Sequence, residues 1–267
     1  MPRFLSRMRT LICLAAMLFV AGACNGTPDP EHIDVSTPGV QQVLVFVDAS
    51  ASAGNVSTLP SVYRDSLRAV IKKRLTEPRD RISIFPVHAK TTSKVGRWDM
   101  RNTVRRPKWS SFAQDRRSRK LMYESKVQSF LKRAQEQAVR HARALYTDRN
   151  FEQWTDLWGT LQVISEEAQP KKGPVRVYYF SDMFESVPGA KRRNFERVPP
   201  TNKAQAQRWA ARDAERIKQQ LSLQPSVLRN VKVRVLPGPL AAKDHALAVK
   251  MYWMRLFEAL GMQATYN

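Results

Sequence analysis

The sequence predicts a doubly wound α/β fold, in which a mostly parallel sheet carries helices on both faces. Short apolar runs typical of buried strands alternate along the chain with segments whose apolar residues recur at helical spacing. The 267 residues are 43% hydrophobic and 25% charged, which gives enough apolar material for a full-sized core and too much for a disordered chain. We therefore expect one main domain.

The first half of this domain begins with a strand. The unbroken apolar run 43–47 is typical of a strand buried on both faces, and the apolar spacing at 67–75 predicts a helix. Ile82–Val87 is the second predicted strand. The next segment has no clear period and holds at most a short edge strand, near Val95–Met100. A long helix follows, whose apolar face runs from Val127 to Leu145.

The second half continues the alternation of helices and strands. Val231, Val233 and Val235 alternate with basic residues, so we expect the strand they form to expose one face and to lie toward an edge of the sheet. The elements predicted in this half are a helix at Leu157–Ala168, a strand at Val175–Phe180, a helix at Ala206–Leu221, the strand at 231–235, a helix at Val249–Leu260 ended by Gly261, and a strand at Ala264–Tyr266.

The N-terminus has the pattern of an export signal, which we assign to residues 1–23. Three arginines precede the short apolar stretch Leu11–Val20, and small residues follow it at Ala21–Ala23. The stretch is too short for a permanent membrane-spanning helix. Cys24 comes next, and Ala-Gly-Ala-Cys resembles a bacterial lipobox, in which this cysteine is acylated. The alternative is ordinary cleavage after Ala23, which leaves a free thiol.

Cysteine usage favours the acyl anchor. Cleavage before Cys24 removes Cys13, so the mature chain holds one cysteine with nothing in the chain to pair with. Residues 24–40 combine Gly, Pro and polar residues without periodicity, and we interpret them as a flexible tether. The folded domain is then 41–267. We expect a lipid-anchored protein of a bacterial cell envelope, on a leaflet that the sequence does not identify.

The chain is strongly basic, with a formal net charge of +22 that falls to +19 without the signal segment. Between Arg68 and Tyr146 there are 22 basic and 6 acidic residues, so the excess is regional. Such a region either binds a polyanion or an anionic membrane surface, or is simply a solvated face. Because the chain is exported, we expect no genomic nucleic acid as a partner. The basic run 191–193 is predicted to be an exposed loop.

Polar side chains follow two predicted buried strands. Asp48, Ser50 and Ser52 come after the first, and Ser181 and Asp182 come after Phe180. Ligands of doubly wound sheets bind beyond the carboxyl ends of the strands. Oxygen-only ligands with few carboxylates suit Mg²⁺ better than a closed Ca²⁺ cage. The alternative is a turn in which these side chains cap backbone groups.

The sequence lacks the motifs of nucleotide-binding sites and of zinc sites built from cysteine or histidine. A nucleotide site at this position would need a glycine-rich loop or a phosphate-loop lysine, and neither is present in the sequence. Two cysteines exclude a cysteine-based zinc module, and the four separated histidines show no ligand spacing.

Asp48-x-Ser50-x-Ser52 resembles the metal-ion-dependent adhesion site (MIDAS) of von Willebrand factor type A (VWA) domains. The segment Thr155–Leu161 is similar to the threonine-bearing loop of that family, and Asp182 matches its Thr-Asp-Gly turn, with Met183 in place of Gly. The resemblance covers about 41–267. It implies a VWA-like fold and a divalent cation, Mg²⁺ or Mn²⁺ with Ca²⁺ as an alternative. The ligands implied by the resemblance are the hydroxyls of Ser50, Ser52 and Thr155, and Asp48 and Asp182 directly or through water.

Three functions are compatible with these observations. In the first, a carboxylate from a protein partner completes the coordination of the cation, and the protein is not an enzyme because no general base or nucleophile accompanies the site. In the second, the metal site is vestigial and the basic region binds a polyanion or an anionic membrane. In the third, the site is a metal-dependent hydrolase, whose activity on a model ester would disappear in Asp48→Ala.

Overall fold

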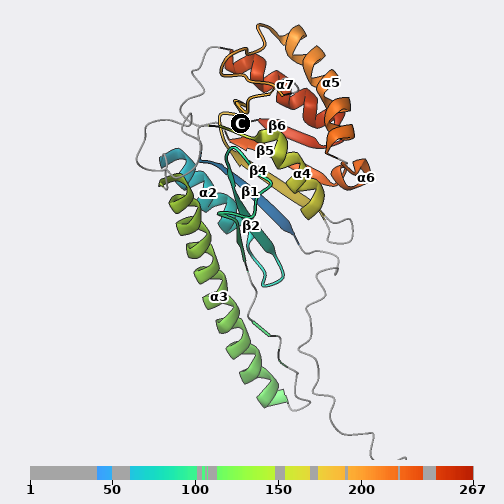
Figure 1. Ribbon diagram of the computed structural model, residues 1–267. Coiled ribbons are helices and arrows are strands. Elements are labelled where there is room, and N and C mark those ends of the chain that lie inside the picture. The colour runs from blue at the N-terminus through green and yellow to red at the C-terminus, as the bar shows by residue number, and fades with distance from the viewer. Residues whose placement is uncertain are drawn as a thin grey trace, which may run out of the picture. The chain divides into compact units, whose positions relative to one another are not determined.

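A six-stranded sheet forms the centre of the protein in the computed structural model (Figure 1). The chain consists of two compact units, Met1–Asp34 and Val35–Asn267. Every described residue belongs to the second unit. The predicted signal segment, Cys24 and the tether lie outside the described residues. The structure describes residues 41–49, 61–100, 104–105, 107, 113–147, 154–168, 174–189, 192–221, 223–236 and 245–266.

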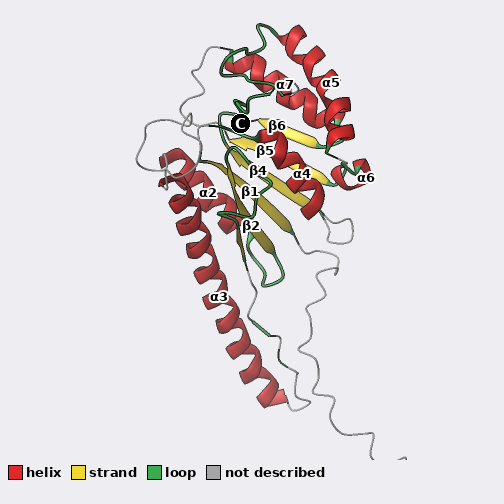
Figure 2. Ribbon diagram, viewed as in Figure 1, coloured by secondary structure: helices red, strands yellow, loops and turns green. Residues whose placement is uncertain are grey.

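The predicted alternation of strands and helices is confirmed (Figure 2). The elements are β1 (Gln42–Asp48), α2 (Ser61–Arg74), β2 (Arg81–Val87), β3 (Trp98–Asp99), α3 (Ala113–Thr147), α4 (Leu157–Glu167), β4 (Val175–Phe180), α5 (Lys203–Gln220), α6 (Pro225–Leu228), β5 (Val231–Leu236), α7 (Ala246–Ala259) and β6 (Gln263–Tyr266).

The strand order in the sheet is β3-β2-β1-β4-β5-β6. All neighbours are parallel except β3, which runs antiparallel to β2. Asp48 lies opposite Val87 on β2, and Val47 lies opposite Phe180 on β4, so these strands end together. We call this the carboxyl edge of the sheet, and we call the opposite edge, where β1 and β2 begin, the amino edge. The fold is therefore doubly wound, as predicted.

Helices cover the two faces of the sheet and enclose two core clusters. Leu44 and Phe46 of β1 pack with residues of α4, α5 and α7, whereas Val43, Val45 and Val47 pack with residues of α2 and α3. All seven residues of β1 are buried, as expected of a central strand with both faces covered. The ring of Phe46 stacks 5.1 Å from the ring of Phe85 and 5.1 Å from that of Tyr179 (centroid distances).

Two predicted elements differ from those observed. The edge strand expected near Val95–Met100 is only the two residues of β3. Helix α3 begins at Ala113, well before the apolar face that starts at Val127. β5 exposes Lys232 and Arg234 on one face as predicted, and it is the last strand but one, with β6 at the edge.

Among the described residues, none of the helices combines the length and the apolar composition that crossing a bilayer requires.

Candidate functional site

The carboxyl edge carries two buried carboxylates on neighbouring strands. Asp48 ends β1 with 1% of its surface exposed, and Asp182 follows β4 with 7% exposed. The hydroxyl of Ser181 donates a hydrogen bond to Asp48 Oδ2 over 2.6 Å. This bond joins the two strand ends, so the two carboxylates predicted from the sequence lie at one edge of the sheet.

The turn that holds Asp182 is fixed by its own backbone. The Met183 amide donates to Ser181 Oγ over 2.9 Å, and the Phe184 amide donates to Asp182 Oδ1 over 3.1 Å. Met183 has a left-handed φ of 66°, a conformation that costs a residue other than glycine about 1–2 kcal/mol. Its carbonyl accepts a hydrogen bond from Trp253 Nε1 over 2.7 Å, which helps to hold this conformation. The chain thus adopts at Met183 a conformation that glycine favours.

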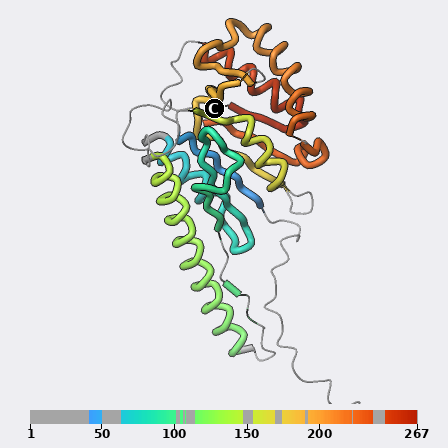
Figure 3. The backbone as a smooth tube through the Cα atoms, viewed as in Figure 1, coloured from blue at the N-terminus to red at the C-terminus, as the bar shows by residue number. Residues whose placement is uncertain are grey.

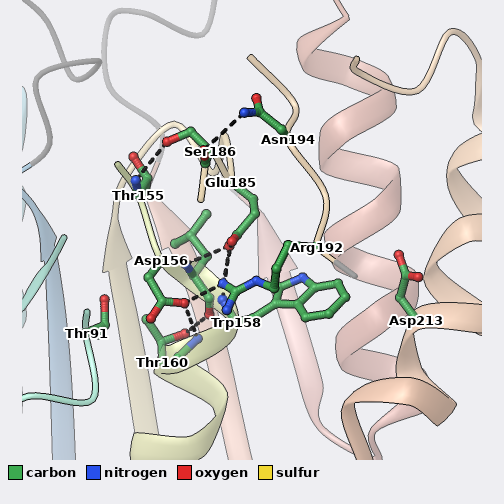
Figure 4. Close-up of polar contacts among 12 residues, drawn as sticks. Thr91, Thr155, Asp156, Trp158, Thr160, Glu185, Ser186, Arg192, Asn194 and Asp213 are labelled. Atoms are coloured by element: carbon green, nitrogen blue, oxygen red, sulfur yellow. Dashed lines mark hydrogen bonds and ion pairs between the residues drawn. The ribbon is translucent and has the colours of Figure 1, made fainter. Parts of the chain in front are cut away.

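Thr155 lies in a segment that connects the ends of β2 and β4. Its amide donates to Ser186 Oγ over 2.8 Å, and its carbonyl accepts from the Ser186 amide over 3.1 Å (Figure 4). The next amide, of Asp156, donates to the carbonyl of His88 over 3.1 Å. His88 follows β2 and Ser186 comes six residues after β4, and β1 lies between these strands. Thr155 is fully buried at the carboxyl edge that also carries the two carboxylates.

Three of the five predicted metal ligands are therefore described, and they gather at one edge. Ser50 and Ser52 lie outside the described residues. In the described part of the chain, there is no group of three or more His, Cys, Asp or Glu residues that could hold a metal ion. The predicted set has only two carboxylates and relies on hydroxyls for the rest, so metal binding remains a prediction.

The two carboxylates at this edge help to raise the pKa of two tyrosines, which lie on the helices α2 and α3. Burial is the main cause that raises the pKa of Tyr63 on α2, and the charges of Asp48 and Asp182 raise it further. The pKa of Tyr146 on α3 is raised by burial and then by the same two carboxylates. Both phenols therefore stay protonated at physiological pH, and both lie within the electric field of the two carboxylates.

A second pair of carboxylates caps the start of α4. Glu185 is fully buried, and its Oε2 accepts hydrogen bonds from the amides of Leu157 (2.8 Å) and Trp158 (3.1 Å). Asp156 is the N-cap, and its Oδ1 accepts from the Gly159 amide over 2.7 Å. A Cβ at Gly159 would lie 2.3 Å from Asp156 Oδ2, so the cap requires glycine there.

Arg192 closes this network (Figure 4). Its guanidinium donates to both Asp156 and Glu185, and it lies over the Trp158 ring at 5.1 Å from the centroid. Burial raises the pKa of Glu185 to about 8, and the positive charge of Arg192 lowers it only in part. The network ties the segment after β4 to the start of α4, and so fixes the segment that carries Thr155.

The loop predicted at 191–193 is confirmed for Arg192 and Arg193, which lie between β4 and α5, but the two side chains are only partly exposed. The side chains of Arg192 and Arg193 are only 23% and 21% exposed, and Lys191 lies outside the described residues. Arg193 donates to both carboxylate oxygens of Asp213 on α5, at 2.6 and 3.0 Å, and lies over the Trp209 ring. Nothing in the sequence separates these arginines from the solvated basic residues, because their partners are distant along the chain.

Trp158 and His88 have structural roles. The side chain of Trp158 is 1% exposed and belongs to the core. His88 is 8% exposed, and its Nδ1 accepts a hydrogen bond from the Lys90 amide over 3.3 Å.

Comparisons with known proteins add little to this geometry. No protein-family model matches the chain, and no curated protein matches it. Among solved structures, the crystal structure of the human COPII-coat protein Sec24c matches with a TM-score of 0.36 and 11% identity, over 86% of this chain and 29% of that chain. The chain thus spans less than a third of the Sec24c chain, and so distant a match says nothing about function.

The fold assignment depends instead on the sheet. Strand order, parallel pairing and the antiparallel edge strand β3 are those expected of the class predicted from the sequence. The fold is of the VWA- or Rossmann-like α/β type. As in the Rossmann-like α/β class in general, the candidate site lies at the carboxyl edge.

Proposed function

We propose that the protein is a lipid-anchored envelope protein whose VWA-like domain binds a protein partner through a divalent cation at the carboxyl edge. The cation, Mg²⁺ or Mn²⁺, would be held by Asp48, Ser50, Ser52, Thr155 and Asp182. One observation carries the proposal. Asp48 and Asp182 lie buried at the ends of the adjacent strands β1 and β4, and Thr155 is buried in a distant segment that is hydrogen-bonded to the residue Ser186 after β4.

The chemistry of this edge suits recognition. Hydroxyl ligands carry no charge, and Asp48 and Asp182 would act directly or through water, so a divalent cation with few carboxylates bound directly keeps positive charge that its own ligands do not neutralise. An acidic side chain of a partner would supply the missing anionic ligand. The buried network of Asp156, Glu185 and Arg192 supports this role, because it holds the Thr155 segment in place before any ligand binds.

Thermal unfolding tests the cation. Both core clusters consist of residues from Val43 onward, so a chain that starts at residue 25 keeps the whole core. A ligand that binds only the native state, at a hundredfold excess over its Kd, stabilises it by about 2.7 kcal/mol. We therefore expect Mg²⁺ or Mn²⁺ to raise the midpoint of this chain relative to chelator, and Asp48→Asn to abolish the rise.

Asp80→Asn is the matched control. Asp80 is also a buried aspartate, 3% exposed, but it lies at the amino edge, where it caps the amides of Thr76 and Glu77. This variant loses stability and keeps the metal response. The proposal is contradicted if the thermal midpoint of the wild-type chain is the same with metal and with chelator. It is also contradicted if metal still raises the midpoint of Asp48→Asn.

The second function, in which the basic region binds a polyanion or an anionic membrane, is favoured by the exposed basic residues of α3. It predicts binding that is lost at high salt and is indifferent to chelator, whereas partner binding through a cation is abolished by chelator. The second function treats the metal site as vestigial, so the response to chelator separates the two.

A further inference from the structure

Helix α3 is much longer than the sheet it covers. Tyr146, near its C-terminus, lies in the field of Asp48 and Asp182 at the carboxyl edge. Gln135 donates to the carbonyl of Leu75, which follows α2 near the amino edge. The eleven residue steps from Gln135 to Tyr146 rise about 16 Å, which matches the length of a strand in this sheet. The rest of α3 therefore extends beyond the amino edge.

We call residues 113–126 the projecting end of α3. At 1.5 Å per residue, this stretch lies roughly 13 to 33 Å beyond Gln135. Figure 3 shows it continuing past the sheet. The α3 residues buried in the core begin at Phe130, so the projecting end contributes nothing to either core cluster.

The projecting end is basic and carries two exposed apolar side chains. Its two acidic residues pair with Arg119 and Lys120 in exposed ion pairs within the helix. Three further basic residues, Arg116, Arg117 and Lys126, are exposed and give the stretch a net charge of +3. Leu121 and Met122 lie among them with 60% and 58% of their surface exposed. A basic helix that also exposes large apolar side chains has the composition of helices that lie on membrane surfaces.

We propose that the projecting end of α3 binds the surface of an anionic membrane. Basic side chains are attracted to acidic lipid headgroups, and aliphatic side chains between them insert at the boundary with the acyl chains. Single-stranded nucleic acid would instead favour exposed aromatic side chains for base stacking. The most exposed large side chains of this stretch, Leu121 and Met122, are not aromatic, and Tyr123, its one aromatic residue, is partly buried.

The topology gives this surface the right orientation. β1 begins at Gln42 on the amino edge, so the segment before residue 41 joins the domain on the side from which α3 projects. If Cys24 carries the proposed acyl anchor, the predicted tether reaches on the order of 20 Å from the membrane, which falls within the range that the projecting end spans. The carboxyl edge, with its candidate site, would then face away from the membrane toward a partner.

Vesicle binding tests the proposal without the lipid anchor. The chain that starts at residue 25 is mixed with vesicles containing phosphatidylglycerol or with vesicles of phosphatidylcholine alone, and the bound fraction is measured by sedimentation. We expect binding to the anionic vesicles only. The triple variant Arg116→Gln, Arg117→Gln, Lys126→Gln lowers the partition coefficient about a hundredfold, at about fivefold per charge. Chelator changes nothing, which separates this result from the metal test.

The matched control removes the same charge from α5. Lys203, Arg208 and Arg212 are exposed there, and their triple change to glutamine also removes one lysine and two arginines. We expect it to weaken binding far less than the α3 variant does. Leu121→Ala with Met122→Ala lowers the partition coefficient severalfold at unchanged charge. All substituted residues are exposed, so the thermal midpoints should stay near that of the wild type.

Three outcomes would overturn the proposal. The first is that the wild-type chain does not bind phosphatidylglycerol vesicles. The second is that the α5 variant loses as much binding as the α3 variant, because the attraction then depends on total charge rather than on this surface. The third is retention of a single-stranded oligonucleotide or an acidic protein in preference to the vesicles.

Discussion

Glu185 is a buried carboxyl group near the candidate site, and its surroundings shift its pKa strongly. It is fully buried, and it accepts hydrogen bonds from two backbone amides at the start of α4 and from the guanidinium of Arg192. These donors favour the charged carboxylate, whereas burial favours the neutral acid and raises its pKa to about 8. A carboxyl group whose pKa is higher in the folded than in the unfolded chain binds more protons when folded.

This shift predicts a pH dependence of stability. Between the ordinary pKa of glutamate, about 4.3, and about 8, the folded chain keeps the Glu185 proton that the unfolded chain has lost. The stabilisation from this group is therefore complete below about pH 4 and is lost as the pH rises toward 8. We expect the wild type to lose more free energy of unfolding between pH 5 and pH 8 than Glu185→Gln does, as measured by urea denaturation. Parallel profiles for the two proteins would contradict the expectation.

Single residues also show how far the sequence predicts this site. Asp48 and Asp182 follow apolar runs, and strands that are parallel end at one edge, so their common location was predictable. Asp156 precedes the α4 segment at an N-cap position, which is a local signal as well. The ion pairs of Arg192 depend on the path of the segment that follows β4, and no local pattern encodes that path.

At the scale of elements, α5 and α7 are joined to the segment after β4 by one buried carboxylate. Asp213 on α5 has no exposed surface, and it accepts hydrogen bonds from Arg193 and from the hydroxyl of Tyr252 on α7 over 3.0 Å. Removing one partner of a buried ion pair leaves the other without compensation for its lost hydration. The three segments therefore depend on this carboxylate for their packing.

Asp213→Ala tests this dependence against a surface pair on the same helix. We expect the substitution to cost about 3–5 kcal/mol in the free energy of unfolding, because Arg193 and Tyr252 lose their acceptor. Glu215 pairs with Lys218 at 2.7 Å and is 68% exposed, so Glu215→Ala should cost at most about 1 kcal/mol. Urea denaturation measures both values. Equal costs would mean that Asp213 is not the buried anchor described here.

Elements that face the core were predictable, and those that do not were missed. The C-terminal part of α3 repeats its apolar residues at helical spacing because it packs on the sheet, and the sequence revealed that part from Val127 onward. The projecting end has good helix formers but no buried face, so it leaves no periodic signal. β3 was overestimated for a similar reason, since an edge strand of two residues has almost no pattern of its own.

For the molecule as a whole, we expect the protection of backbone amides against hydrogen exchange to decrease from the centre of the sheet to the projecting end of α3. β1 lies between β2 and β4, and all seven of its residues are buried. Residues 113–126 contribute no side chain to either core cluster, and short helical stretches without core packing are marginally stable in water. Although both regions belong to one domain, we expect local unfolding of β1 to cost far more free energy than local unfolding of residues 113–126.

Hydrogen exchange followed by mass spectrometry measures this gradient. We expect amides of 117–126 to exchange orders of magnitude faster than those of 134–145 in the same helix, because Ala134, Ala138, Ala142 and Leu145 are buried against the core and the earlier stretch is not. Amides of β1 should be the slowest. Uniform protection along α3 would mean that the projecting end is covered by another part of the protein. That result would leave no free surface there for a membrane to bind.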